Sequence, residues 1–314
     1  MIQNIAVIGA GTMGCRIAHT FAAQGLQVSI FDAFEAARAS AMGKIQQDLE
    51  FLIAEGVMDA ETAEKTVGNI KLCNDLASAV EGAEYVIECI FEDIKLKQEL
   101  FVELDKLCDA DTLITSNTSS LPLSEMIRYV PEERKAKTMI CHWYNPAHLV
   151  PIVELTKFGN MSEADFQTVY ELYVRTGKKP VCVLKDVPGM VANRLLHALA
   201  RESFSLVEQG VASAEDIDTA LKFGPGFRAA TTGMLEAADM GGLDIWCATE
   251  ESLFPNLCNA AQPCELMRSR VEQGKVGIKA GEGFFSYPEE KRQQAQNDFF
   301  RRLIIQGNAS KNYP

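Results

Sequence analysis

The sequence predicts an α/β fold in its first part and an all-α domain after it. Short β-branched runs alternate with helical patterns in the first half, which is typical of a parallel sheet with helices on both faces. The turn-like segment KDVPG, with Pro188 and Gly189, ends this alternation, and the chain beyond it is rich in helical patterns. We therefore expect a doubly wound sheet domain over residues 1–186 and a helical domain over residues 187–314.

Eight short runs are expected to form the sheet, because each is rich in apolar and β-branched residues and is bounded by turn residues. They are Asn4–Ile8, Gln27–Phe31, Ile70–Leu72, Tyr85–Glu88, Leu113–Ser116, Thr138–Cys141, Ile152–Leu155 and Pro180–Leu184. The second and third runs are separated by more chain than a crossover needs. Helical patterns over about Phe34–Glu55 and Asp59–Val67, broken at Gly56, predict a helical arm there, which would form a wall for a ligand.

Helical patterns account for most of the second half of the chain. The expected helices are Met190–Gln209, Ser213–Leu221, Met234–Met240, Leu243–Leu253 and Ala260–Glu272. A domain of this length buries several amphipathic helices poorly when it is alone. We therefore expect it to pack against a second copy, so that the protein is a homodimer.

The composition excludes several classes of protein. With 314 residues, 47% of them hydrophobic, the chain can bury a large core, and its net charge of −13 argues against nucleic-acid or membrane-surface partners. We expect neither a signal peptide nor a membrane-spanning helix. Nine scattered cysteines without a C-x-x-C pair favour a cytoplasmic protein. Neither they nor the four histidines have the spacing of zinc ligands, so no metal is expected.

A glycine-rich turn follows the first expected strand and opens a helical pattern. The turn G-A-G-T-M-G spans residues 9–14, and Gly9, Gly11, Thr12, Met13 and Gly14 are its candidate cofactor-binding residues. Its glycines permit a tight turn, close approach of a pyrophosphate and close packing of helix on strand. Asp32, at the end of the second strand, can bind the adenine ribose and repel a 2′-phosphate. The pattern predicts a Rossmann-type domain that binds NAD, with a purely structural turn as the alternative.

Residues that suit proton transfer follow in HWYNPAHLVPIVEL, which contains His142, Asn145 and Glu154. Histidine titrates near neutral pH, and a carboxylate at the end of the neighbouring strand can orient it. The segment indicates His142 as a general base oriented by Glu154, with a structural histidine as the alternative. Structural roles are expected for the other histidines, His19, His148 and His197.

Small polar residues form two further candidate groups. The segment SNTSSLP, residues 116–122, directly follows a strand, where open α/β sheets bind their ligands. A turn that caps the next helix explains the same residues equally well. Asn193, in GMVANRLL, lies near a helix start, either as a cap or as a buried polar group that orients a neighbour.

Together these blocks resemble the 3-hydroxyacyl-CoA dehydrogenase family over almost the whole chain. The similarity rests on GAGTMG with Asp32, IECIFEDIKLKQELF, SNTSSL, HWYNP with Glu154, DVPGMVANRLL, GLD at Gly242–Asp244 and GIKAGEGFFSY, in the family's order. The resemblance implies an NAD-dependent dehydrogenase with a doubly wound Rossmann-type sheet, a helical arm and an all-helical dimerising domain.

The resemblance also implies roles for individual positions. His142 is implied as the base, Glu154 as the acid that orients it and stabilises its protonated form, and Ser119 as the partner of the reacting oxygen. Asn193 is implied as a polar partner near the base. Contacts with the cofactor are implied for Glu92, Lys97, Asn145 and Lys279. The implied reaction passes hydride from the carbon of a secondary alcohol to NAD while His142 takes the hydroxyl proton.

The sequence departs from the family pattern where a substrate would be held. Members that use CoA carry serine and lysine on the arm helix, and counting from Asp32 places Asp48 and Glu55 at those positions. Glu50, Asp59 and Glu61 lie nearby. An acidic arm suits a 3′-phosphate poorly, unless an alignment shift gives that role to Lys44 or Lys65. Further on, GFRAATTGM replaces M-G-P and introduces Arg228, which is either a clamp for a substrate carboxylate or a surface residue.

Two substrate classes therefore stay open within one chemistry. One is a (S)-3-hydroxyacyl-CoA, as in fatty acid metabolism, and the other is a small free hydroxycarboxylate, either carnitine-like or a hydroxylated aromatic acid. A non-catalytic nucleotide-binding or structural protein is the alternative from another class. The set His142, Glu154, Ser119 and Asn193 argues against that alternative, because a protein without catalysis has no need of all four.

Overall fold

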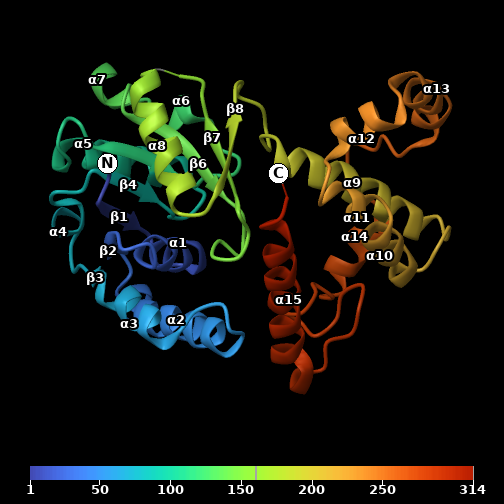
Figure 1. Ribbon diagram of the computed structural model, residues 1–314, viewed down its shortest axis with the longest axis horizontal. Coiled ribbons are helices and arrows are strands. Elements are labelled where there is room, and N and C mark those ends of the chain that lie inside the picture. Colours follow the sequence, from blue (N-terminus) through green and yellow to red (C-terminus); the bar gives the residue numbers. More distant parts are fainter. Residues whose placement is uncertain (160, 314) are drawn as a thin grey trace. The chain divides into compact units, whose positions relative to one another are not determined.

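The described strands of the computed structural model lie in the first part of the chain. They are β1 (Asn4–Ile8), β2 (Gln27–Phe31), β3 (Ile70–Leu72), β4 (Tyr85–Glu88), β5 (Leu113–Ser116), β6 (Thr138–Trp143), β7 (Ile152–Thr156) and β8 (Lys179–Val183). They form one sheet in the order β3-β2-β1-β4-β5-β6-β7-β8 (Figure 1). The order grows outward in both directions from β1, which confirms the expected doubly wound fold.

One pair of strands departs from the parallel arrangement. Neighbouring strands in the described sheet pair in parallel, except that β6 and β7 pair antiparallel. The segment between them is too short for the crossover of a dozen or more residues that a parallel pair requires. The antiparallel register sets His142 directly opposite Glu154.

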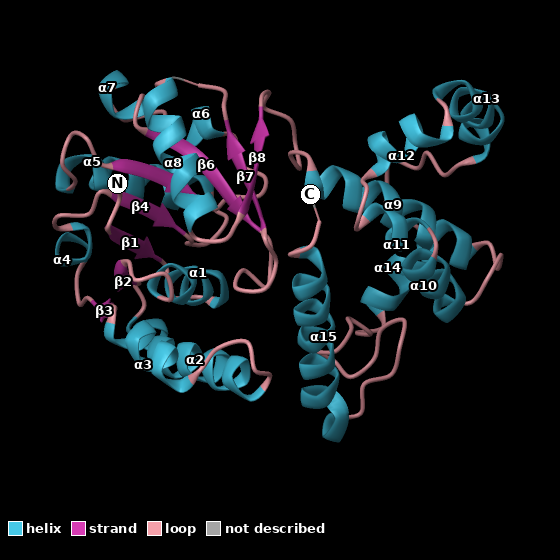
Figure 2. Cartoon of the chain, viewed as in Figure 1, coloured by secondary structure: helices cyan, strands magenta, loops and turns pink. Residues whose placement is uncertain are grey.

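Helices cover both faces of this sheet (Figure 2). They are α1 (Thr12–Ala22), α4 (Leu76–Val80), α5 (Ile94–Leu107), α6 (Leu123–Met126), α7 (Glu132–Lys135) and α8 (Glu163–Arg175). On one face, Phe21 of α1 and Tyr173 of α8 contact the ring of Tyr85. On the other face, Phe101 of α5 packs into an apolar core with Val86. Because Tyr85 and Val86 are neighbours in β4, their side chains point to opposite faces of the sheet.

The expected arm is a pair of helices between β2 and β3, α2 (Glu35–Ala54) and α3 (Ala60–Gly68), which lie beside α1 (Figure 1). The inner face of α2 buries residues at helical spacing, namely Ala41, Ile45, Leu49 and Leu52. Asp59 caps α3, since its side chain accepts the Thr62 N–H at 2.7 Å. The chain turn between the two helices passes through Gly56, whose φ is +69°.

The structure describes residues 1–159 and 161–313, which divide into two compact units, Met1–Ala192 and Asn193–Pro314. The sequence placed this boundary slightly earlier, after residue 186. The second unit is helical, with α9 (Ala192–Glu208) at its start followed by α10 (Ala214–Phe223), α11 (Pro225–Ala229), α12 (Met234–Gly241), α13 (Leu243–Leu253), η1 (Phe254–Asn256), α14 (Glu265–Glu272) and α15 (Glu289–Ser310). None of the described helices is both long and apolar enough to cross a membrane.

Two helices of the second unit were absent from the sequence-based expectation. The short helix α11 begins at Pro225, a residue that is well tolerated in a first helical turn. The long helix α15 buries only Phe300 among its side chains. Its first half is almost entirely polar, so the apolar periodicity by which a helix is recognised is missing there. The helix expected from Ala260 begins instead at Glu265.

Candidate active site

The glycine turn between β1 and α1 is shaped for close backbone contact. At Gly9, where φ is +110°, a Cβ atom would lie 2.6 Å from the carbonyl oxygen of Cys89. At Gly14 a Cβ atom would collide with the carbonyl oxygen of Gly9. Gly11 faces open space and lines a cavity. The fold therefore requires the first and third glycines, while the second leaves room for a phosphate at the N-terminus of α1.

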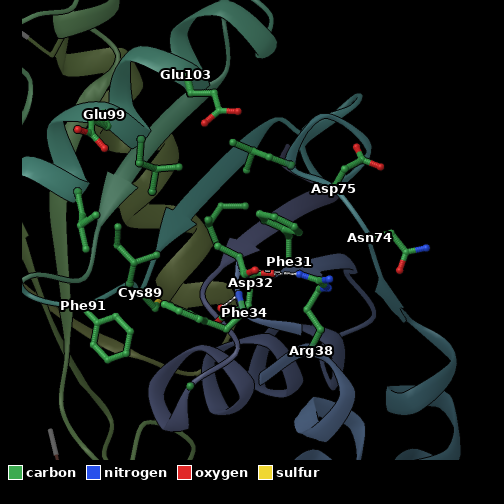
Figure 3. Close-up of a pocket in the computed structure, with 17 residues that line it drawn as sticks. Phe31, Asp32, Phe34, Arg38, Asn74, Asp75, Cys89, Phe91, Glu99 and Glu103 are labelled. Carbon is green, nitrogen blue, oxygen red and sulfur yellow. Dashed lines mark hydrogen bonds between the residues drawn. The ribbon is translucent and has the colours of Figure 1, made fainter. Parts of the chain in front are cut away.

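Asp32 directly follows β2 and lines the same cavity, which has a volume of about 680 Å³ (Figure 3). Its Oδ2 accepts the Ala10 N–H at 2.7 Å, and its Oδ1 accepts the Phe34 N–H at 2.9 Å. Arg38 donates to the Asp32 carbonyl oxygen at 2.5 Å. These hydrogen bonds hold the carboxylate beside the glycine turn, where an adenine ribose would lie.

The rest of the cavity fits the adenosine part of NAD. Two exposed aromatic rings, Phe34 and Phe91, contact each other edge to face in its lining, and Figure 3 shows both. Carboxylates also line it, namely Asp75, Glu99 and Glu103. Negative charges here disfavour a 2′-phosphate, which agrees with NAD as the cofactor.

His142 and Glu154 meet across the β6–β7 ladder. His142 Nδ1 lies 2.9 Å from Glu154 Oε2. The other carboxylate oxygen, Oε1, accepts the backbone N–H groups of Val191 at 2.8 Å and Ala192 at 2.9 Å. Glu154 is fully buried and His142 is 6% exposed. The carboxylate is thus fixed from both sides, and the imidazole is oriented by it.

The protonation of this pair follows from its contacts. Burial raises the pKa of Glu154, but the hydrogen bonds from His142 and from two backbone N–H groups outweigh burial and hold the pKa below its usual value. Glu154 is therefore ionised at neutral pH and can only accept. In the neutral imidazole, Nδ1 must then carry the hydrogen, which leaves Nε2 as an acceptor. This arrangement can remove a proton from a hydroxyl group.

The loop after β5, which contains Ser119, is organised by Glu92. The carboxylate oxygen Oε1 of Glu92 accepts hydrogen bonds from Thr118 Oγ1, Ser119 N, Ser120 N and Ser120 Oγ. In the same loop, Asn117 Oδ1 accepts the Trp143 N–H at 2.8 Å. Since Trp143 follows His142 at the end of β6, the loop lies at the same edge of the sheet as His142.

Lys97 is buried below the surface of this region. Its Nζ lies 2.6 and 2.8 Å from the two carboxylate oxygens of Glu88 and 3.4 Å from Glu92 Oε2. Lys97 is 1% exposed and Glu88 is fully buried. The predicted contact between Lys97 and the cofactor stays a prediction. Sequence reasoning did not single out Glu88, although an acid that closes the apolar strand YVIE was a usable signal.

The arm is tied to α1 through Asp48. Arg16 donates to both carboxylate oxygens, from Nε to Oδ2 at 2.9 Å and from Nη2 to Oδ1 at 3.2 Å. Arg16 Nη1 also donates to Asn145 Oδ1 at 3.1 Å. The predicted contact between Asn145 and the cofactor stays a prediction. Arg16 was not a sequence candidate, because its meeting with Asp48 depends on how α1 and α2 pack.

Three candidate residues belong to the second unit. Asn193 lies in the first turn of α9, directly after Ala192, and the Ala192 N–H donates to Glu154. Arg228 is an exposed residue of α11, and Lys279 is exposed in the segment between α14 and α15. Their predicted roles toward substrate and cofactor stay predictions.

Comparison with known proteins agrees with the fold and with the glycine turn. A family model described as the NAD-binding domain of 3-hydroxyacyl-CoA dehydrogenase matches residues 4–187, and the model of that family's C-terminal domain matches residues 189–287. The chain is 35% identical to the mitochondrial hydroxyacyl-coenzyme A dehydrogenase of Rattus norvegicus, over 91% of this chain and 92% of the other.

Another relative acts on a substrate of a different kind. The chain is 36% identical, over 97% of both chains, to the 5-formyl-3-hydroxy-2-methylpyridine 4-carboxylate 5-dehydrogenase of Mesorhizobium japonicum. A solved structure of an enzyme with this activity, described as an NAD+-dependent dismutase, matches with a TM-score of 0.90 and 34% identity over the whole of both chains.

Proposed function

Because the chain belongs to the 3-hydroxyacyl-CoA dehydrogenase family and is an NAD-dependent oxidoreductase, we propose that its substrate is a small free carboxylate and not a CoA thioester. The substrate carries its reacting hydroxyl on a saturated carbon beside an aromatic ring, or it carries a hydrated formyl group on the ring. The observation that carries this proposal is the state of Asp48 on the arm. The CoA thioester is the competing substrate.

Asp48 occupies the arm position at which the family resemblance implies contact with CoA. Burial raises the pKa of Asp48, but the neighbouring His19 and Arg16 side chains outweigh burial and hold the pKa well below its usual value. The carboxylate is therefore ionised, and Arg16 binds both of its oxygens. A position that is negatively charged and already bound is poorly suited to hold a phosphorylated nucleotide.

The basic residues of the arm give little support to a CoA site. Lys44 Nζ donates to the Ala10 carbonyl oxygen at 3.3 Å, toward the glycine turn, and Lys65 Nζ lies 2.7 Å from Glu61. Acidic residues outnumber basic ones in the arm: Glu35, Asp48, Glu50, Glu55, Asp59, Glu61 and Glu64 stand against Arg38, Lys44 and Lys65. The arm thus repels the CoA phosphates.

The relative from Mesorhizobium japonicum supports the aromatic carboxylate. By its name, the substrate of this relative is a pyridine that bears a free carboxylate, a hydroxyl and a formyl group. Its sequence and this one align over nearly their full lengths. A substrate of this chemical class needs a proton acceptor at the reacting oxygen and a cation for the carboxylate, but no site for a nucleotide.

The chain's own residues divide the reaction between them. His142 Nε2 accepts the proton of the substrate hydroxyl, and Glu154 stabilises the imidazolium that forms. Ser119 donates a hydrogen bond to the reacting oxygen, and Asn193 orients the polar groups beside the base. Bound NAD would supply the hydride acceptor for the carbon that carries this oxygen. A secondary alcohol becomes a ketone in this way, and a hydrated formyl group becomes a carboxylic acid.

We assign the substrate carboxylate to Arg228, whose guanidinium can bind two carboxylate oxygens at once. Replacement Arg228→Met is expected to raise KM for a free acid about tenfold or more while kcat changes less. The measurement is steady-state kinetics with the best acid found. An unchanged KM would remove Arg228 from the proposal.

The deciding experiment measures NADH formation from NAD+ with paired substrates. Each pair consists of a 3-hydroxyacyl-CoA and the corresponding free acid, and hydroxylated or formylated aromatic acids and carnitine complete the panel. We expect kcat/KM for an aromatic free acid to exceed that for every thioester by at least about tenfold, which is 1.4 kcal/mol of transition-state binding. Preference for a thioester would overturn the free-acid assignment and leave the hydride chemistry intact.

We also propose that the second unit, with helices α9 to α13, forms a homodimer. Large apolar side chains are exposed on these helices, among them Leu195, Phe223, Phe227, Leu235, Met240 and Leu243. Apolar surface of this extent favours burial against a second copy. Sedimentation should show a species of twice 34.5 kDa. A single species at the monomer mass would contradict the dimer.

A further inference from the structure

Three side chains of types that bind metals meet at one point of the first unit, and none of them belongs to the His142–Glu154 pair. His19 comes from α1, Asp48 from the arm helix α2, and His148 from the segment between β6 and β7. Their donor atoms all lie within 4.8 Å of one another. None of the three was expected to bind a metal, because residues so far apart in sequence have no recognisable spacing.

His19 is the most deeply buried member of this group. The residue is 1% exposed, and its Nε2 makes no hydrogen bond within the described chain. Nε2 points toward Asp48 and lies 3.7 Å from Oδ2, beyond hydrogen-bonding distance. A buried imidazole nitrogen without a hydrogen bond costs free energy, and a cation between it and the carboxylate would remove that cost.

The spacing suits a small divalent cation. Zinc bound at about 2.0–2.2 Å in a tetrahedron holds its donor atoms about 3.3–3.6 Å apart. The separation of 3.7 Å between His19 and Asp48 is already close to this value, and the ring of His148 lies 5.2 Å from the ring of His19, centre to centre. His148 lies in a turn, and its donor atom is within 4.8 Å of the other two.

The charge of the carboxylate ligand also suits a cation. Asp48 is ionised, as described above. His148 packs edge to face against His19 and offers an imidazole nitrogen as a further ligand. Two positive groups oppose binding, namely Arg16, which is bound to Asp48, and Lys178, which faces His148. We therefore expect weaker binding than in closed structural zinc sites.

From this geometry we propose that His19, Asp48 and His148 bind one divalent transition-metal cation of the zinc class. Two imidazoles and one carboxylate provide three ligands and leave the fourth position to water. The cation joins α1, the arm and the segment after β6, and it shares Asp48 with Arg16. Its effect is to fix the arm against α1, and it takes no part in hydride transfer.

The test uses the full chain after dialysis against a chelator, titrated with CoCl2 and then with ZnCl2 in competition. The visible absorption of Co2+ reports nitrogen and oxygen ligands, whereas thiolate ligands add an intense near-ultraviolet band. We expect one equivalent to bind and to raise Tm. The variant His148→Gln should weaken binding at least tenfold and abolish the rise in Tm, while the control His197→Gln should behave as the unmodified chain.

The variant His148→Gln is the decisive test of the metal site, because it leaves the Arg16–Asp48 pair intact. Circular dichroism can check that this variant is folded. A second variant, Asp48→Asn, should weaken Co2+ binding to a similar degree. Unchanged affinity in His148→Gln, a thiolate band, or no binding by the unmodified chain would each overturn the proposal. These measurements do not involve turnover, so their failure is distinct from failure of the proposed substrate.

Discussion

Two histidine–carboxylate pairs in the first unit differ in geometry. In the first, His142 Nδ1 lies 2.9 Å from Glu154, and the two residues face each other across a β ladder. In the second, His19 Nε2 lies 3.7 Å from Asp48, and the residues come from two packed helices. The same two chemical groups are thus held at hydrogen-bonding distance in one place and beyond it in the other.

The remaining partners of each carboxylate explain the difference. Glu154 accepts two neutral backbone N–H groups, so its negative charge is left for the imidazole. Asp48 is bound by the Arg16 guanidinium through both oxygens, and His19 Nε2 stays 3.7 Å from the carboxylate. The other groups bound to each carboxylate therefore distinguish the two histidines. Backbone N–H groups leave Glu154 to orient His142 as a base, whereas the Arg16 guanidinium occupies Asp48 and leaves His19 as a candidate ligand.

The largest expected effect comes from breaking the first pair at its base. Replacement His142→Gln should lower kcat by about 10³- to 10⁴-fold, because the substrate hydroxyl loses its proton acceptor. NADH binding, followed by fluorescence, should stay within a factor of about three, and His197→Gln serves as the matched histidine control. Near-normal turnover in His142→Gln would remove the base from the mechanism.

A smaller loss of kcat is expected when only the negative charge of Glu154 is removed. Glu154→Gln keeps the shape, but its amide can donate to Nδ1, which forces the hydrogen onto Nε2 and blocks proton acceptance. We expect kcat to fall by about 10²- to 10³-fold and Glu154→Asp to retain more activity than Glu154→Gln. Equal kcat values for the two variants would show that the charge is not needed.

A change at Asp48, in the second pair, should lower the stability of the folded chain. Asp48→Asn removes the charge that binds Arg16 between α1 and the arm, and we expect the free energy of unfolding to fall by about 1–3 kcal/mol. Urea unfolding measures this change, with the exposed arm residue Glu64→Gln as a control that should stay within about 0.5 kcal/mol. Equal stabilities for both variants would mean that the Arg16–Asp48 contact does not hold the arm.

The smallest expected effect is a change of pH dependence. The pKa of Asp48 is lowered in the folded chain, so its contribution to stability is complete above the ordinary value of 3.8 and is lost as pH falls through the lower folded-state value. The free energy of unfolding should therefore decrease below about pH 4, and less steeply in Asp48→Asn. Parallel pH profiles for the two proteins would contradict this assignment.

The sequence was a good guide wherever the relevant contacts are local. The glycine turn, Asp32 and the eight strands follow from short patterns, and the strand bounds differ from those expected by at most two residues at either end. The His142–Glu154 contact was also within reach, because a short connection between two strands forces an antiparallel register. Helix α15 was missed, since its polar first half carries no apolar period.

Contacts between distant segments lay beyond the sequence. Nothing near Asp48 in the chain indicates that Arg16 and His19 lie beside it. Hydrophobic period and turn chemistry act over a few residues, and they place secondary structure and the groups at its ends. Which side chains meet between packed elements depends on the angles and separations of whole helices, which are set by the complete core.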